Sequence, residues 1–158
     1  MFVDGDIDGV EVRRLTKHDD ARGWLCEVYR SDEATEEVAP AMAYVSVTRV
    51  GVTRGPHEHV AQSDRFVFLG PSSFLVVLWD NRAGSATYRR RMRFSVGEDA
   101  PATVVVPPGV VHGYRNVGGV DGVVLNLPNR LFRGVDRREA VDEVRHEDEP
   151  GSVFRMDG

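Results

Sequence analysis

The sequence predicts an all-β fold, a sandwich or barrel built from many short strands. Short apolar segments recur about every 8–12 residues along the chain, and turn-forming residues separate them. Only residues 31–40 and parts of 130–148 have a pattern that would allow a helix. The length of 158 residues fits one domain, over residues 1–158, with a full core and one pocket.

Turn-forming residues separate several of the expected strands. In chain order they cover residues 9–15, 22–30, 43–50, 65–69, 74–80, 86–96, 102–107, 113–117 and 122–128. The Gly-Pro-Ser-Ser of residues 70–73 makes one turn, the Pro-Pro-Gly of residues 107–109 stops a buried strand, and Gly118-Gly119 marks a later turn.

Composition excludes several classes of partner. The net charge of −5 provides no general positive field for nucleic acid. The single cysteine, Cys26, cannot form an intrachain disulfide, which fits a reducing compartment. The acidic first residues show no signal peptide, and no apolar run approaches the roughly 20 residues of a membrane span. We therefore expect a cytoplasmic protein that binds neither nucleic acid nor membrane.

Two separated motifs place three histidines in a common frame. The first motif, G-x5-H-x-H-x4-D-x5-G, comprises Gly51, His57, His59, Asp64 and Gly70. The second, P-x-G-x2-H-x3-N, comprises Pro107, Gly109, His112 and Asn116. Together they resemble the two motifs of the cupin superfamily. That resemblance implies a cupin-type double-stranded β-helix, a jelly-roll barrel with few short helices.

The spacing of the first motif has a direct structural meaning. Residues i and i+2 of a strand point to the same side, so His57 and His59 are expected to face the interior and Glu58 the exterior. Three imidazoles and a carboxylate suit a divalent first-row metal. One interpretation is therefore a metal-dependent cupin, a dioxygenase, isomerase or small-molecule binder, with His57, His59, Asp64 and His112 as ligands.

A narrower resemblance covers most of the chain. Segments 20–27, 51–57, 79–88, 106–114 and 146–150 match, in order, segments of the dTDP-4-dehydrorhamnose 3,5-epimerase family, for example GVTRGPH and VPPGVVHGY. This branch of the cupins works without a metal cofactor. Its members transfer protons on a nucleotide-linked 4-keto-6-deoxy sugar, so the resemblance implies an isomerase that epimerises C3, C5 or both through an enolate.

The resemblance also implies catalytic roles. It makes His57 the base that removes the proton and Asp148 the carboxylate that backs it. Arg65 takes the place of a family lysine that stabilises the enolate, and His112 is the second pocket histidine. The family's tyrosine acid falls on Leu125, which leaves the general acid open.

Substrate contacts and assembly follow from the same resemblance. Arg22, Glu27 and Arg54 match positions that contact the nucleotide or its diphosphate, and His59 and Tyr114 are further substrate-lining candidates. The family forms homodimers in which the positions of Arg22 and Glu27 reach the partner's site. Tyr88 and Tyr114 are candidates for the missing acid, and the family residues that read the base fall near Met42 and Tyr44.

Two other interpretations stay open. The stretch RGPHEH also resembles the dTDP-sugar 3,4-ketoisomerases, in which two histidines on one strand move protons between neighbouring carbons. The absence of the family tyrosine also allows a non-catalytic protein that binds a sugar nucleotide.

Overall fold

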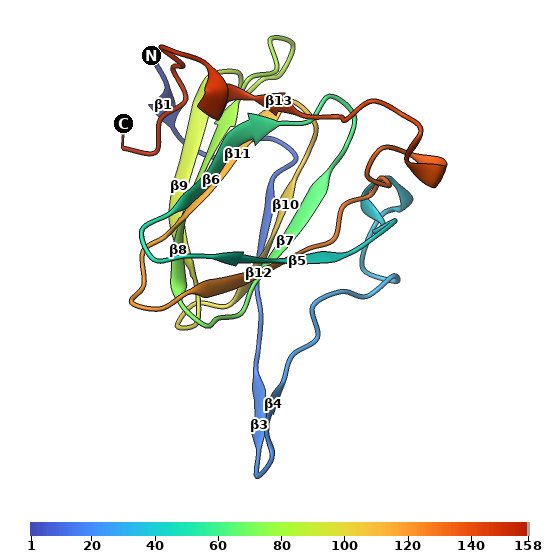
Figure 1. The fold of residues 1–158 in the computed structure, drawn as a ribbon, viewed down its shortest axis with the longest axis vertical. Helices are drawn as coiled ribbons and strands as arrows, with labels where there is room; N and C mark the ends of the chain where they lie inside the picture. The colour runs from blue at the N-terminus through green and yellow to red at the C-terminus, as the bar shows by residue number, and fades with distance from the viewer. Residues whose placement is uncertain (158) are drawn as a thin grey trace.

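Two facing β-sheets and one projecting hairpin make up the fold (Figure 1). The computed structural model describes residues 1–157. In sheet order, the six-stranded sheet comprises β1 (Val3–Asp4), β9 (Arg90–Gly97), β8 (Ser73–Asp80), β11 (Val110–Asn116), β6 (Thr53–Glu58) and β13 (Val144–Arg145). The five-stranded sheet comprises β2 (Glu11–Arg14), β10 (Ala102–Val106), β7 (Asp64–Phe68), β12 (Gly122–Asn126) and β5 (Tyr44–Thr48).

The predicted all-β jelly roll is confirmed. The two sheets remain separate, so the hydrogen-bonded ladder does not close into a single barrel. The three helices of the described residues are single 3₁₀ turns, η1 (Glu36–Val38), η2 (Val135–Arg137) and η3 (His146–Asp148). They lie in the two segments where the sequence allowed helix. No helix of residues 1–157 is long and apolar enough to cross a lipid bilayer.

The main core lies between the two sheets. On β7 the inward side chains are Phe66 and Phe68, and they meet Phe74 of β8 and Tyr114 of β11 from the opposite sheet. The ring centroids of Phe68 and Phe74 are 5.3 Å apart. Aromatic contacts of this kind add to the free energy gained by burying the rings.

A second apolar cluster lies on the outer face of the six-stranded sheet. Val77 and Trp79 of β8 are buried there by Phe154 and Met156 of the C-terminal segment. This explains why β8 reads as a nearly continuous apolar run, because both of its faces are covered. The charged tail is thus pinned to the sheet by its apolar end.

The hairpin of β3 (His18–Asp20) and β4 (Gly23–Leu25) projects away from the two sheets (Figure 1). It replaces the long strand expected over residues 22–30, since regular pairing ends at Leu25. Trp24 and Leu25 are 49% and 66% exposed. Large apolar side chains held this far from the core of one subunit are available to another surface.

Removing the tail's aromatic anchor tests this packing. Phe154 is buried, and its ring centroid is 5.9 Å from Trp79 and 5.5 Å from Phe2. We expect Phe154→Ala to lower the free energy of unfolding by about 3 kcal/mol, as a cavity replaces the ring. Val153 is exposed, so Val153→Ala is the matched control, with an expected change below about 0.5 kcal/mol. Equal urea midpoints for both variants would show that the tail is not packed on the sheet.

Candidate active site

A large cavity opens between the two sheets at one end of the jelly roll. Its volume is about 1350 Å³, and its walls come from β5, β6, β7 and β11. Most of residues 128–143, together with Arg145 and Glu147 of the same C-terminal segment, also line it and form its mouth. Ligand cavities of drug-sized molecules are typically smaller, about 300–1,000 Å³, so this one can hold a large, two-part ligand.

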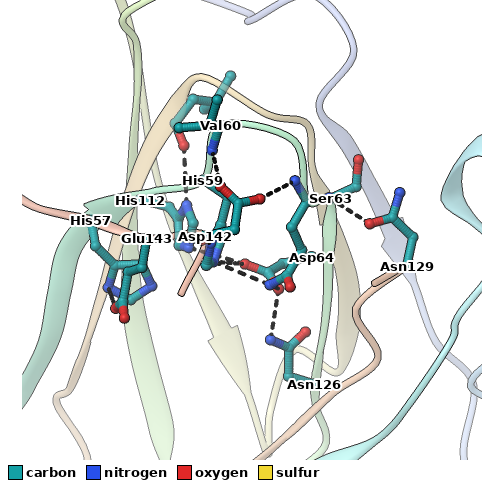
Figure 2. Close-up of polar contacts among 12 residues, drawn as sticks. His57, His59, Val60, Ser63, Asp64, His112, Asn126, Asn129, Asp142 and Glu143 are labelled. Carbon is teal, nitrogen blue, oxygen red and sulfur yellow. Dashed lines mark hydrogen bonds and ion pairs between the residues drawn. The ribbon is translucent and has the colours of Figure 1, made fainter. Parts of the chain in front are cut away.

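Three histidines meet at the cavity wall, where His57 and His59 line the cavity and His112 is buried behind them. His57 of β6 is paired in register with His112 of β11, and their ring centroids are 4.5 Å apart. His59 follows two residues later and lies 5.6 Å from His57, also lining the cavity. Figure 2 shows the three rings gathered around one point. Glu58 points the other way, as the strand period requires.

Gly55 allows β6 to approach β11 this closely. Its φ of +76° lies in the left-handed region that favours glycine. A Cβ at this position would stand 2.6 Å from the carbonyl oxygen of His112. The ladder between the two strands shifts register just here, between His112 and Tyr114. The backbone geometry of the site therefore requires a glycine at position 55, two residues before His57.

Asp64 joins the histidines to the opposite sheet (Figure 2). Its carboxylate is 1% exposed, and its Oδ2 lies 3.0 Å from Nε2 of His59 and 3.3 Å from Nε2 of His112. Its Oδ1 accepts hydrogen bonds from Nδ2 of Asn126 at 2.9 Å and Nε2 of Gln62 at 3.0 Å. Burial alone would raise the pKa of Asp64, but these bonds from His112 and His59 hold it well below its usual range.

His59 is engaged on both sides of its ring. Its Nδ1 donates to the backbone carbonyl of Asp142, and its Nε2 faces the Asp64 carboxylate. Burial alone would lower the pKa of His59, but the bonds to Asp64 and Asp142 outweigh it and raise the pKa to about 9. His59 is therefore an imidazolium at neutral pH and has no free lone pair.

His57 has the opposite electrostatic character. Burial, and then the charges of His112 and His59, lower the pKa of His57 to about 2. The ring is consequently neutral and can accept a proton. Its Nδ1 faces two carboxylates, Oε1 of Glu143 at 3.7 Å and Oε1 of Glu147 at 3.9 Å. These oxygens would stabilise positive charge on the ring once it forms.

Two sets of polar contacts attach the C-terminal segment that carries these glutamates to β6 and to the loop after it. The Asp142 carboxylate accepts backbone N–H bonds from Val60, Ala61 and Gln62 at 2.7, 3.0 and 2.8 Å. Burial would raise the pKa of Asp142, but these donors keep it below its usual range. Asp142, Glu143 and Glu147 were not predicted from the sequence. Asp142 and Glu143 lie in a charged stretch with no motif or period, and in the matching segment 146–150 the expectation fell on Asp148, the neighbour of Glu147.

The second fastening uses Glu58. This residue was expected to face the exterior, but the C-terminal segment covers it, and it is only 9% exposed. Its Oε1 accepts a hydrogen bond from Nδ2 of Asn81 at 2.8 Å and lies 3.0 Å from Nε2 of His146. The middle residue of the His-Glu-His triplet thus holds the segment that covers the cavity.

Two predicted catalytic residues lie away from the cavity. The expected contact between His57 and Asp148 is absent, because Asp148 is exposed and its Oδ2 accepts from Nε of Arg145 at 2.9 Å. Arg65 lies on the outer face of β7, where its guanidinium is 5.6 Å from the ring of Tyr29. The inward residue beside it is Asp64, whose carboxylate lies next to His59 and His112.

The predicted substrate contacts divide into two groups. Arg54 and Tyr114 line the cavity, and Arg54 is held by Oγ1 of Thr48 at 2.9 Å and the carbonyl of Val47 at 2.7 Å. Arg22 and Glu27 lie on and after the projecting hairpin, where they pair with Asp20 and Arg30.

The structure also shows which positions considered for the missing general acid lie at the cavity. Leu125, where the family tyrosine falls, pairs with Val45 and Val67 on the outer face of its sheet. Tyr88 is exposed and lies outside the cavity lining. Tyr44, which had been matched only to a base-reading position, lines the cavity.

Within residues 1–157, two groups of side chains have a spacing that could hold a metal ion. In the first, His57, His59 and His112 offer ring nitrogens within 4.8 Å of one another, and in the second His57 joins Glu143 and Glu147. The first set includes His59, whose nitrogens are already both engaged by Asp142 and Asp64. A metal ligand needs a free lone pair, so binding there would require His59 to lose a proton and a partner.

Facing sheets with a histidine cluster at their open end define a cupin-type protein. The family model for dTDP-4-dehydrorhamnose 3,5-epimerase matches residues 4–124. A probable low-salt glycan biosynthesis epimerase of Haloferax volcanii, Agl13, is 36% identical over 129 residues, covering 80% of this chain and 81% of the relative. The chain belongs to the dTDP-4-dehydrorhamnose 3,5-epimerase family, and it is therefore an isomerase of the epimerase type.

Solved structures agree on the fold. A dTDP sugar isomerase from Desulfovibrio desulfuricans has a TM-score of 0.81 at 20% identity, over 96% of this chain and 93% of the other. A 3,5-epimerase from Legionella pneumophila, solved in complex with dTDP-4-keto-L-rhamnose, has a TM-score of 0.72 at 18% identity, over 84% and 72% of the two chains.

The charge on His59 gives the fold a defined pH dependence. Its pKa of about 9 exceeds the ordinary value of 6.5, so the protonated ring stabilises the fold fully below pH 6.5, and this contribution is lost as pH rises through 9. We expect His59→Gln to be less stable than the wild type at about pH 6, by on the order of 2 kcal/mol, with most of the gap closed by about pH 10. Urea unfolding at both pH values measures the gap.

The exposed His18 on the hairpin supplies the control for this prediction. His18→Gln should leave the stability unchanged at both pH values. A gap for His59→Gln that stays constant with pH would contradict a charged His59.

Proposed function

We propose that the protein is a nucleotide-sugar epimerase that acts on a dTDP-4-keto-6-deoxy sugar, with His57 as the base. The observation that carries the proposal is the position of His57 in the cavity wall, with Glu143 and Glu147 beside its Nδ1. A 4-keto group acidifies the C–H bonds at C3 and C5, so a positioned neutral imidazole can remove one of these protons. The two glutamates then stabilise the imidazolium.

The cavity supports a sugar nucleotide as the ligand. Its volume of about 1350 Å³ accommodates both a sugar and a nucleoside diphosphate. The guanidinium of Arg54, fixed by Val47 and Thr48, suits a diphosphate because its planar fork binds oxygens in pairs. Family membership and the ligand of the Legionella neighbour favour dTDP and a 4-keto sugar.

The enolate oxygen needs a donor, and we assign this role to His112. Its ring lies 4.5 Å from that of His57, and its Nδ1 donates to the carbonyl of Val110 at 3.0 Å, which fixes the ring. Its Nε2 is buried and lies 3.3 Å from Oδ2 of Asp64, without a hydrogen bond of normal geometry within residues 1–157. A donor that is only weakly engaged before the reaction can turn to an oxyanion that develops in the transition state. Arg65 keeps no part in this step.

The reaction needs no cofactor in this proposal. A metal-dependent reaction would use His57, His59, Asp64 and His112, but this set serves better as a proton-transfer cluster. Asp64 and His59 form an ion pair, and that pairing leaves His59 without a free lone pair, which supports a metal-free site. The 3,4-ketoisomerase alternative rests on the nearness of His57 and His59. Its product would carry the keto group at C3, whereas an epimerase keeps the keto group at C4 and inverts a neighbouring carbon.

We further propose that the protein works as a homodimer in the cytoplasm. The exposed Trp24 and Leu25 of the hairpin, and Val45 and Val47 on the outer face of the five-stranded sheet, form apolar surface suited to a second copy. A hairpin exchanged between subunits would carry Arg22 and Glu27 toward the partner's cavity. The free Cys26 fits the reducing cytoplasm.

Hydrogen–deuterium exchange at the sugar tests the base. Chelator-treated protein in D₂O should replace the C3 or C5 proton of dTDP-4-keto-6-deoxyglucose by deuterium. Proton NMR measures this replacement as the loss of the C3 or C5 proton signal. We expect His57→Asn to slow this exchange by at least about 10²-fold, because the base is gone, with nucleotide binding retained. Asp148→Asn is the control and should stay within about threefold of the wild type, since its carboxylate faces solvent.

Two results would count against this assignment. Exchange that continues in His57→Asn would remove the base role, and exchange that appears only after a divalent metal is added would favour the metal-dependent reading of the same cluster.

The hairpin prediction is tested by oligomeric state. Wild-type protein should sediment at twice the monomer mass, and the double variant Trp24→Ser, Leu25→Ser should dissociate, because it removes the apolar surface of the hairpin. The control is Val120→Ser, which changes a similarly exposed residue between β11 and β12. A wild type that sediments as a monomer at micromolar concentration would refute the hairpin exchange.

A further inference from the structure

The geometry points to Tyr44 as the general acid that returns a proton to the sugar from the face opposite His57. This inference rests on the proposed function and adds a residue to it. Inverting a carbon centre requires one group to remove the proton and another to deliver a proton from the other side. His57 supplies the first group, and the family position for the second holds the outward-facing Leu125.

Tyr44 lies on the wall of the cavity that faces the histidines. His57 belongs to β6 of the six-stranded sheet, and Tyr44 begins β5 of the five-stranded sheet. Tyr44 pairs in register with Asn126 of β12, whose side chain points inward to Asp64. Both Tyr44 and His57 line the cavity, so a ligand between the sheets has one of them on each side.

The hydrogen bonds of Asn126 fix the direction of the Tyr44 hydroxyl, and Figure 2 shows the one that joins Asn126 to Asp64. Asp64 is ionised and can only accept, so the atom of Asn126 that faces it must be the amide nitrogen. The same nitrogen lies 2.8 Å from the Tyr44 oxygen and donates its second hydrogen there. The Tyr44 oxygen is therefore an acceptor in this bond, and its own proton is free for a ligand in the cavity.

The amide donor also prepares Tyr44 to give up that proton. When the hydroxyl becomes a phenolate, the hydrogen bond from Asn126 becomes charge-assisted and stronger. Before the reaction, burial raises the pKa of Tyr44 to about 12, so the hydroxyl holds its proton at neutral pH. Tyr44 is thus protonated when the enolate forms and has a donor ready to stabilise the charge it acquires.

The other three tyrosines have different surroundings. Tyr114 is packed among Phe66, Phe68 and Phe74 in the main core, and its hydroxyl is 3.3 Å from Oγ of Ser46. Tyr29 lies against Arg65 on the outer face of the five-stranded sheet. Tyr88 is exposed and stacks near Arg89. Tyr44 is the tyrosine among residues 1–157 whose hydroxyl combines a cavity position with a fixed amide donor.

The proposed step conserves protons. His57 breaks the C–H bond beside the ketone and becomes an imidazolium, while the electron pair moves into the enolate. The O–H bond of Tyr44 then breaks, a new C–H bond forms on the opposite face, and the ketone is restored. The imidazolium releases its proton to solvent water and the phenolate regains one from water, which returns both residues to their starting states.

The test separates exchange from inversion. With dTDP-4-keto-6-deoxyglucose in D₂O, a proton removed and replaced on the same face by His57 exchanges without inversion. Tyr44→Phe should therefore keep deuterium exchange while the ratio of epimer formed to deuterium incorporated falls by at least about 10²-fold. Proton NMR follows both quantities in one sample. Tyr88→Phe is the matched control and should keep the wild-type ratio, because this hydroxyl lies outside the cavity.

Each outcome decides the assignment. A Tyr44→Phe protein that epimerises at the wild-type ratio would overturn it. A variant in which exchange and epimerisation fall together would also overturn it, since that result indicates a role in binding or folding. If wild-type protein shows no exchange, the proposed function fails as well, and this result is distinct from a failure of Tyr44 alone.

Discussion

The buried carboxylate of Asp64 is the interaction on which the rest of the site depends. It projects from one sheet to His112 of the other and to His59 in the following loop, at the end of the jelly roll where the apolar core stops. An unpaired charge in such a place would cost several kcal/mol, so its partners must be present and correctly protonated. The charged state of His59 follows from this requirement, and the low pKa of His57 follows first from its burial and then from the nearby His112 and His59.

Much of this arrangement could be predicted from local spacing. The two-residue period of a strand places His57 and His59 on one side, and the Pro-Pro-Gly turn before β11 brings in His112. These relations need only a few neighbouring residues and no knowledge of distant contacts. The jelly-roll fold and the gathering of the three histidines were accordingly confirmed.

Errors arose where a single position decides which way a side chain points. Arg65 and Asp64 are neighbours on β7, and a shift of one residue exchanges the inward for the outward one. The same alternation separates Leu125 from Asn126 on β12. The expected partner of His57 in the C-terminal segment was Asp148, whereas Glu143 and Glu147 lie beside the ring, and this difference has another reason. That segment has no regular period, and its position is set by contacts with residues more than 80 positions earlier, such as that of His146 with Glu58.

The C-terminal segment lies both at the mouth of the cavity and beside His57. The stretch that lines the mouth of the cavity also holds Glu143 and Glu147 against His57, and Asp142 fastens it to the loop after β6. The entrance of the cavity and the negative charge beside His57 therefore belong to one segment of the chain. Any displacement of this segment would widen the entrance and take Glu143 and Glu147 away from His57 at the same time, so access to the cavity and the electrostatics at His57 are coupled.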